Sequence, residues 1–299
     1  MRRPTKVGTS ERSPFNIMKI KKISVLLFVP AFFLLALPAF AQTQKLLKRT
    51  TYKTEKVDFG VGGTISIIGA PTGSITIEGW QKNEVEISAE IEVQAENEAD
   101  LAQLADVNSF TFDVTMGRLG IKSVGSFDKN YLKRERKKFS KTLLGMPVKI
   151  DYKIKVPVFS DLEIDGGRGD FDLSGVEGAM RINFLDTNAR LRLSGGGIAA
   201  TLGSGNVNVE ILPRSWRGQG ANIQLGKGTL NLLLPINLNA DLDASILRTG
   251  KIENAFTVLK PRDRTKFTEK LINAKAGSGG AKFVFTVGDG DLRITPRVN

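Results

Sequence analysis

The chain has 299 residues, of which 41% are hydrophobic, and it carries a formal net charge of +12 without any cysteine or histidine. This length suits one large domain or two ordinary ones, and the hydrophobic content is sufficient for a core. The missing residue types exclude disulfides, Ser-His-Asp and Cys-His nucleophiles and the usual zinc sites, so stability must come from burial of apolar side chains.

The N-terminal region predicts export. A basic stretch over 19–22 precedes an apolar run over 23–40, which ends in the small-x-small pattern of residues 39–41. We therefore predict a signal peptide within residues 1–41 that is cleaved after Ala41, with Met18 as an alternative start. An uncleaved membrane anchor is the other interpretation, because the run is just long enough to span a bilayer. The expected location is the periplasm, the outer surface or the extracellular space.

Alternating apolar residues predict β-strands in the segment that follows. A stretch rich in Ala, Leu and Glu over 95–107 interrupts them and predicts one helix of about three turns. The strands are expected over 64–67, 74–77, 84–93, 110–114 and 148–156.

A basic insertion at 128–141 separates the last two of these strands. Removal of residues 1–41 leaves 36 basic and 30 acidic side chains, a net charge of +6, and the insertion holds much of this excess. We expect this insertion to attract anionic lipid head groups or phosphate-bearing polymers, at about 1 kcal/mol for each basic residue near an anionic surface. The alternative is a solvated insertion between strands. The candidate anionic-ligand residues are Lys129, Lys133, Arg134, Arg136, Lys137, Lys138 and Lys141.

From Leu162 to Ala244 one pattern recurs nine times: a short strand with alternate apolar residues, then a turn usually marked by Gly, Pro, Asn or Asp. The commonest step between strand centres is nine residues, and glycines in the turns reach positive φ without steric cost. This pattern predicts a β-solenoid of stacked short strands, with an antiparallel β-sandwich as the alternative. The strands are expected over 162–164, 171–173, 180–184, 189–193, 198–202, 207–211, 221–225, 230–234 and 238–242.

After the repeats, residues 256–275 are charged and predict an irregular connection. Two last strands are expected over 282–287 and 291–295. We therefore expect residues 42–299 to form a single elongated all-β domain, with core repeats over 162–244.

Several segments resemble the bacterial putative-adhesin family of Gly-rich β-strand repeat proteins. They are Gly73-Ser-Ile-Thr-Ile-Glu-Gly-Trp80, Ile154-Lys-Val-Pro157 and Leu162-Glu-Ile-Asp-Gly-Gly-Arg-Gly-Asp-Phe-Asp-Leu173. The resemblance covers about residues 57–296 and implies an exported β-helix-like domain whose function is not settled. The basic insertion at 128–141 is not a feature of that family.

Acidic residues and tryptophans are the remaining candidates for chemistry. Carboxylates close in sequence are compatible with a calcium site or an acid pair, although turn and outward strand positions also explain them. Trp80 and Trp216 are either exposed sugar-stacking platforms or packing residues. The Gly-rich turns lack the spacing of dinucleotide-binding and phosphate-binding loops, so no cofactor is expected. The acids in question are Asp165, Asp170, Asp172, Asp289 and Asp291.

We therefore expect a non-catalytic exported envelope or surface protein whose repetitive face mediates adhesion or scaffolding with an envelope or surface partner. One alternative is an envelope-stress sensor that binds anionic lipid or polymer through 129–141, with an affinity that falls as salt rises. The other is a polysaccharide-active β-helix enzyme with acids on adjacent coils. Nucleic acid is not expected, because no interleaved aromatic residues form a stacking platform. The sequence leaves the oligomeric state open.

Overall fold

The computed structural model of the chain describes residues 46–134, 139–213, 215–262 and 264–297. All of them belong to one compact unit, Gln44–Asn299. The predicted signal peptide and its cleavage point lie outside the described residues. Strands make up 61% of the described residues, which confirms the all-β class.

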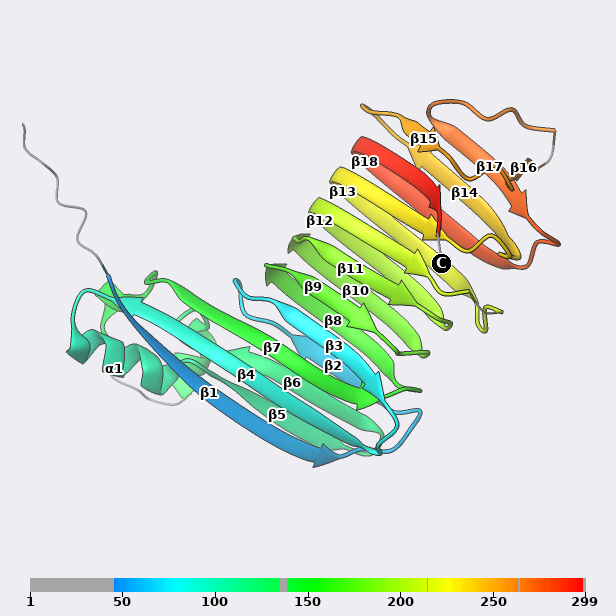
Figure 1. The fold of residues 1–299 in the computed structure, drawn as a ribbon. Coiled ribbons are helices and arrows are strands. Elements are labelled where there is room, and N and C mark those ends of the chain that lie inside the picture. Colours follow the sequence, from blue (N-terminus) through cyan, green and yellow to red (C-terminus); the bar gives the residue numbers. More distant parts are fainter. Residues whose placement is uncertain (1–45, 135–138, 214, 263, 298–299) are drawn as a thin grey trace, which may run out of the picture. The chain divides into compact units, whose positions relative to one another are not determined.

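Eighteen strands carry the fold in the described part of the chain (Figure 1). Three short helical segments accompany them: α1 (Glu98–Val107), α2 (Lys129–Arg134) and the 3₁₀ turn η1 (Lys141–Leu143). The strands are β1 (Leu47–Asp58), β2 (Thr64–Ile68), β3 (Ile75–Trp80), β4 (Glu84–Ala95), β5 (Ser109–Thr115), β6 (Arg118–Val124), β7 (Val148–Pro157), β8 (Asp161–Arg168), β9 (Phe171–Ser174), β10 (Ala179–Asp186), β11 (Ala189–Leu193), β12 (Gly197–Ile211), β13 (Gly220–Leu234), β14 (Ala240–Ile246), β15 (Ile252–Asn254), β16 (Lys260–Pro261), β17 (Leu271–Ala276) and β18 (Ala281–Pro296).

The repeats stack as coils of two strands each, and each coil contributes one strand to each of two parallel ladders. In the first ladder, Ile182 of β10 lies between Ile164 of β8 and Ala200 of β12. In the second ladder, Leu191 of β11 lies between Leu173 of β9 and Val209 of β12. Paired residues in β8, β10 and the first half of β12 are therefore 18 positions apart, twice the nine-residue step in the sequence. This parallel pairing agrees with stacked coils and contradicts an antiparallel sandwich for the repeats.

The core lies between the two ladders. Ile164, Leu173, Ile182 and Leu191 are at most 2% exposed and belong to one continuous cluster of buried apolar residues. Their sequence neighbours alternate toward the solvent, as the period of two predicts. Each such side chain contributes about 1.5–3 kcal/mol of hydrophobic stabilisation when it is fully buried.

Glycines form a column at one corner of the coils. Gly205, Gly228 and Gly290 have φ values of +129°, +136° and +131°. A Cβ on any of them would overlap a carbonyl oxygen of the adjacent coil, that of Thr187, Gly205 and Gly228 respectively. Glycine is required here both for the backbone conformation and for the close approach of the coils.

The spatial order of the strands differs from their chain order at both ends of the stack. Strands β2 and β3 lie between β6 and β7 on one side and β8 and β9 on the other. At the opposite end the final strand, β18, lies between β13 and the pair β14 and β15 (Figure 1). Antiparallel strands complete the two ends: β1 and β4 extend from β7, β5 extends from β6, and β17 and β16 extend from β14.

The structure corrects one predicted connection and contains strands that the sequence patterns did not predict. The connection over 256–275 is not irregular throughout, because β17 pairs antiparallel with β14 and β16 pairs with β17. Strands β1, β6 and β15 were not expected. In β1 the residues on the side facing the core include Arg49, Lys53 and Glu55, so the apolar alternation that reveals other strands is missing.

The helix expected over 95–107 is present as α1. Asn97 caps it by accepting a hydrogen bond from the Asp100 amide at 3.0 Å, and Leu101 and Leu104 are buried. The second helix, α2, was not expected and lies within the basic insertion. No helix in the described residues is long and apolar enough to cross a membrane.

Candidate anionic-ligand site at the basic insertion

The basic insertion is folded onto the body of the protein. Leu132 of α2 and Leu143 of η1 are buried, and Phe127, Phe139 and Met146 pack against the core. These five apolar side chains, two before and three after the undescribed residues 135–138, hold the described parts of the insertion in place. A purely solvated loop would not need these anchors.

Asp128 positions the start of α2. Its Oδ1 accepts hydrogen bonds from the backbone amides of Asn130 and Tyr131, both at 3.0 Å, and its Oδ2 lies 3.1 Å from Lys122 Nζ. The Tyr131 amide and Lys122 hold the pKa of Asp128 below its ordinary value against the opposing effect of burial. This acid is therefore ionised at neutral pH and is already engaged within the insertion and its neighbouring strand.

Four predicted site residues lie on the surface of the insertion: Lys129, Lys133, Arg134 and Lys141 are all exposed. No acidic side chain among the described residues forms an ion pair with any of these four. Lys129 and Lys133 are four positions apart in α2, so they share one helix face. The other three predicted residues, Arg136, Lys137 and Lys138, lie outside the described residues.

A hollow of about 600 Å³ borders Lys129, the first of these cations. Its apolar wall consists of Pro71, Phe127, Leu144, Met146, Pro147 and Val148. Lys129 lines it as well, so one member of the cationic cluster directly borders an apolar surface. Leu144 on this wall is 36% exposed.

Two further charges at the hollow are neutralised by neighbours. Lys149 Nζ lies 2.6 Å from Asp151, and this hydrogen bond is the main reason why the pKa of Lys149 is raised. Glu92 lies 2.5 Å from Lys48 Nζ, which lowers the pKa of Glu92. Lys129 is thus the lysine of the hollow without an acidic partner among the described side chains.

Sequence reasoning found the cations but missed the hollow. Its lining comes from the β2–β3 connection, from β4, from the start of α2 and the segment before it, and from the start of β7 and the segment between η1 and β7. These segments carry no shared motif, and only the chain path brings them together. The nearest signal in the sequence is the group Leu143-Leu144-Gly145-Met146-Pro147, an apolar stretch next to a charge run.

The acidic residues considered for calcium or catalysis connect neighbouring coils. Asp165 accepts a hydrogen bond from Asn183 at 2.8 Å, and Asp170 accepts one from Asn188 at 3.2 Å, each partner being 18 residues further on. Asp289 accepts bonds from Arg248, at 2.9 Å from its Nε, and from Thr249. These bonds support the structural interpretation of the acids. No group of three or more acidic side chains in the described ranges is arranged to hold a metal ion.

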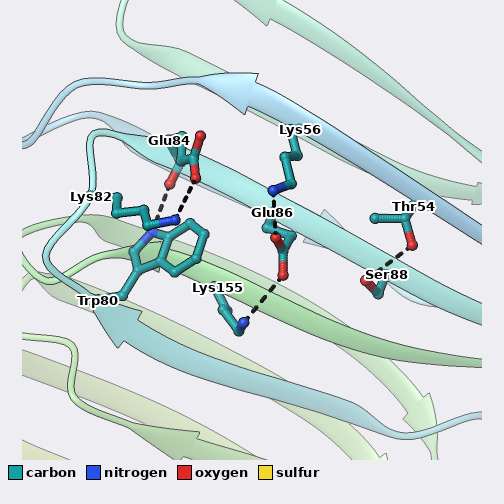
Figure 2. A network of polar contacts seen from close by, with 8 residues as sticks. All are labelled: Thr54, Lys56, Trp80, Lys82, Glu84, Glu86, Ser88 and Lys155. Atoms are coloured by element: carbon teal, nitrogen blue, oxygen red, sulfur yellow. Dashed lines mark hydrogen bonds and ion pairs between the residues drawn. The ribbon is translucent and has the colours of Figure 1, made fainter.

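Trp80 already has cationic neighbours on its ring (Figure 2). Lys82 Nζ and Lys155 Nζ lie 4.6 and 5.2 Å from the ring centroid, and the indole Nε1 donates to the Glu84 carbonyl oxygen at 2.8 Å. Glu86 in turn lies 3.2 Å from Lys155 and 3.1 Å from Lys56. Because lysines lie over its ring, Trp80 is better explained as a packing residue than as a sugar-stacking platform.

Trp216 is also a packing residue. Its ring meets Phe283 edge-on, with centroids 4.9 Å apart, and it packs against the apolar core. Neither tryptophan therefore offers the exposed ring face that stacking with a sugar requires.

No protein-family model matches the chain, and no curated protein is similar to it in sequence. Three solved structures resemble its fold at a distance. A putative cell adhesion protein from Clostridium sporogenes is 13% identical with a TM-score of 0.42, covering 83% of this chain and 100% of its own. A putative adhesin from Bacteroides fragilis is 12% identical with a TM-score of 0.30, covering 82% of this chain and 97% of its own. A putative lipid binding protein from Parabacteroides distasonis is 14% identical with a TM-score of 0.27, covering 81% and 96%. These likenesses are too distant to transfer a function.

Proposed function

We propose that the chain is a non-catalytic, exported binding protein of the cell envelope or surface. The stacked coils serve as a rigid scaffold, and the basic insertion contacts an anionic envelope component. The observation that carries this proposal is the cluster of four exposed cations, Lys129, Lys133, Arg134 and Lys141, on an insertion anchored to the core. Export follows from the predicted signal peptide.

The insertion differs from the coils in carrying four exposed cations on one short segment, whereas several basic side chains of the coils are paired with acids. Arg192 lies 3.1 Å from Glu210, and Arg293 lies 3.0 Å from Glu253, so these outward arginines are balanced by acids of adjacent strands. The four insertion cations have no such balance among the described side chains. At about 1 kcal/mol for each residue near an anionic surface, together they supply about 4 kcal/mol of attraction.

The non-catalytic part of the proposal is supported by the acids. A polysaccharide-active enzyme needs carboxylates that are free to transfer protons or attack a substrate. Asp165, Asp170 and Asp289 instead hold residues of adjacent coils through hydrogen bonds. This arrangement favours a binding or scaffold role over glycan cleavage.

The test is sedimentation of the chain 42–299 with vesicles of phosphatidylglycerol and phosphatidylcholine, and separately its capture on immobilised dextran sulfate, at low and high salt. The variant changes Lys129, Lys133, Arg134 and Lys141 to Gln. We expect binding to both anionic probes at low salt, a steep fall at high salt, and at least about a 100-fold loss in the variant.

The matched control changes four other exposed lysines to Gln and therefore carries the same net charge as the variant. They are Lys227, Lys260, Lys266 and Lys282. Retention of most of the binding in this control would locate the effect in the insertion. Equal losses in the two variants, or no binding of the unmodified chain to either anionic probe, would refute the proposal.

A further inference from the structure

The apolar hollow beside Lys129 is the feature of the site that an anionic polymer does not explain. A polymer held by charge needs a row of cations along its length, whereas this hollow offers a wall of Phe127, Leu144, Met146 and Val148. A highly charged chain placed there would leave the apolar wall without a partner. The wall therefore points to a ligand that has an apolar part as well as a charge.

We infer that the hollow binds the hydrocarbon chain of an anionic amphiphile, with the headgroup at Lys129. This inference rests on the proposed function and narrows the ligand class from anionic envelope material in general to single molecules with an acyl or alkyl chain. The hollow volume of about 600 Å³ lies within the ordinary range for small-molecule sites.

Charge complementarity selects the anionic headgroup. Lys149 is bound to Asp151 at 2.6 Å and Glu92 to Lys48 at 2.5 Å, so both are balanced. Lys129 borders the hollow without an acidic partner among the described residues, and Lys133 lies one helical turn further along α2. A negative headgroup next to Lys129 would gain from both cations, while a positive headgroup would be repelled.

The wall is also suited to a flexible chain. Met146 is an unbranched, adaptable side chain that fills irregular space, and Leu144 is partly exposed at the hollow, so both can contact a ligand there. Burial of an alkyl chain against Met146 and Leu144 increases the affinity about fourfold for each methylene removed from water. Affinity should therefore rise with chain length until the hollow is filled.

The experiment uses the chain 42–299 and three probes below their micelle concentrations: octyl, decyl and dodecyl phosphate, measured by isothermal titration calorimetry. Decyl trimethylammonium serves as the cationic counterpart. We expect one alkyl phosphate bound per chain, affinity that rises at least tenfold from octyl to decyl phosphate, and no comparable binding of the cationic probe.

Two substitutions separate the roles of the wall and the cation. Leu144→Gln should remove most of the dependence on chain length, whereas Lys129→Gln should weaken all three phosphates and keep that dependence. Ile236→Gln is the matched control, because Ile236 is an exposed apolar residue outside the hollow, at 65% exposure. It should behave like the unmodified chain.

The possible outcomes distinguish this inference from the proposed function. If dextran sulfate binds through the insertion cations but affinity for the alkyl phosphates is independent of chain length, the inference is overturned and the proposed function stands. If neither dextran sulfate nor anionic vesicles bind, the proposed function fails. Equal behaviour of Leu144→Gln and Ile236→Gln would also overturn the inference.

Discussion

Gly290→Ala should be among the glycine-to-alanine substitutions that lower the stability of this protein most. Gly290 has φ +131°, a conformation that L side chains rarely adopt, and an added Cβ would overlap the carbonyl oxygen of Gly228 in the adjacent coil. Backbone strain of this kind costs about 1–3 kcal/mol, and forcing an atom into a packed position costs about 1–3 kcal/mol more. We therefore expect a loss of about 2–6 kcal/mol, a large share of the ~5–15 kcal/mol that stabilises a typical domain.

Alanine substitutions at three other glycines separate the cost of backbone strain from the cost of steric overlap. Gly60 has neither positive φ nor a neighbour within 4 Å of the added atom, and Gly117 has φ +71° but an equally open surrounding. Gly226 lacks positive φ, but its added Cβ would lie 2.5 Å from the Gly203 carbonyl oxygen. Alanine should be nearly neutral at Gly60, cost about 1 kcal/mol at Gly117 through strain alone, and cost about 1–3 kcal/mol at Gly226 through contact alone.

The assay is urea unfolding of the chain 42–299, followed by far-UV circular dichroism. The four alanine variants are compared by the free energy of unfolding, with a constant slope against urea as the check that they unfold in the same way. If Gly290→Ala stays within about 0.5 kcal/mol of Gly60→Ala, the coils do not approach at this corner as described, and the explanation of the glycine column is refuted.

Three further predictions concern titration, core packing and strand order. Burial raises the pKa of Tyr152 from 10.0 to about 12, so its contribution to stability is present below about pH 10 and lost as pH rises through about 12. An alkaline absorbance titration should show one of the three tyrosines ionising late, and Tyr152→Phe should remove that step; uniform titration near pH 10 would contradict this. Ile182→Ala should cost about 2–5 kcal/mol in urea unfolding, because it leaves a cavity, whereas Arg181→Ala on the exposed face should stay within about 0.5 kcal/mol; similar costs would disprove the assignment of faces. Truncation after Gly280 removes β18, which pairs with both β13 and β14, so hydrogen exchange should lose protection over 240–276 and keep it over 162–211; retained protection over 240–276 would show that β18 is dispensable.

Local patterns in the sequence were sufficient to predict the strands and turns whose conformation depends on the residue types at those positions. The alternation over 162–244 identifies the buried face, because successive side chains of a strand point to opposite sides. Glycines mark the corners because few other residues tolerate positive φ. The pattern fails in β1, where Arg49 and Lys53 occupy positions on the side facing the core. There the strand is stabilised by pairing with β4 and by contacts such as the Lys53 Nζ bond to the Phe110 carbonyl oxygen at 3.1 Å.

Pairing partners and the candidate site depend on contacts between distant residues. A nine-residue step between strands is compatible with coils of different strand number. Only the register of Ile164 with Ile182 establishes that each coil has two strands. The insertion of β18 between β13 and β14 cannot be read from chain order, because it depends on pairing between strands that are distant in the sequence. The charge run at 128–141 was visible in the sequence, but the hollow beside it was not. Its wall is assembled from segments separated by up to about 80 positions, and only the folded chain brings them into contact.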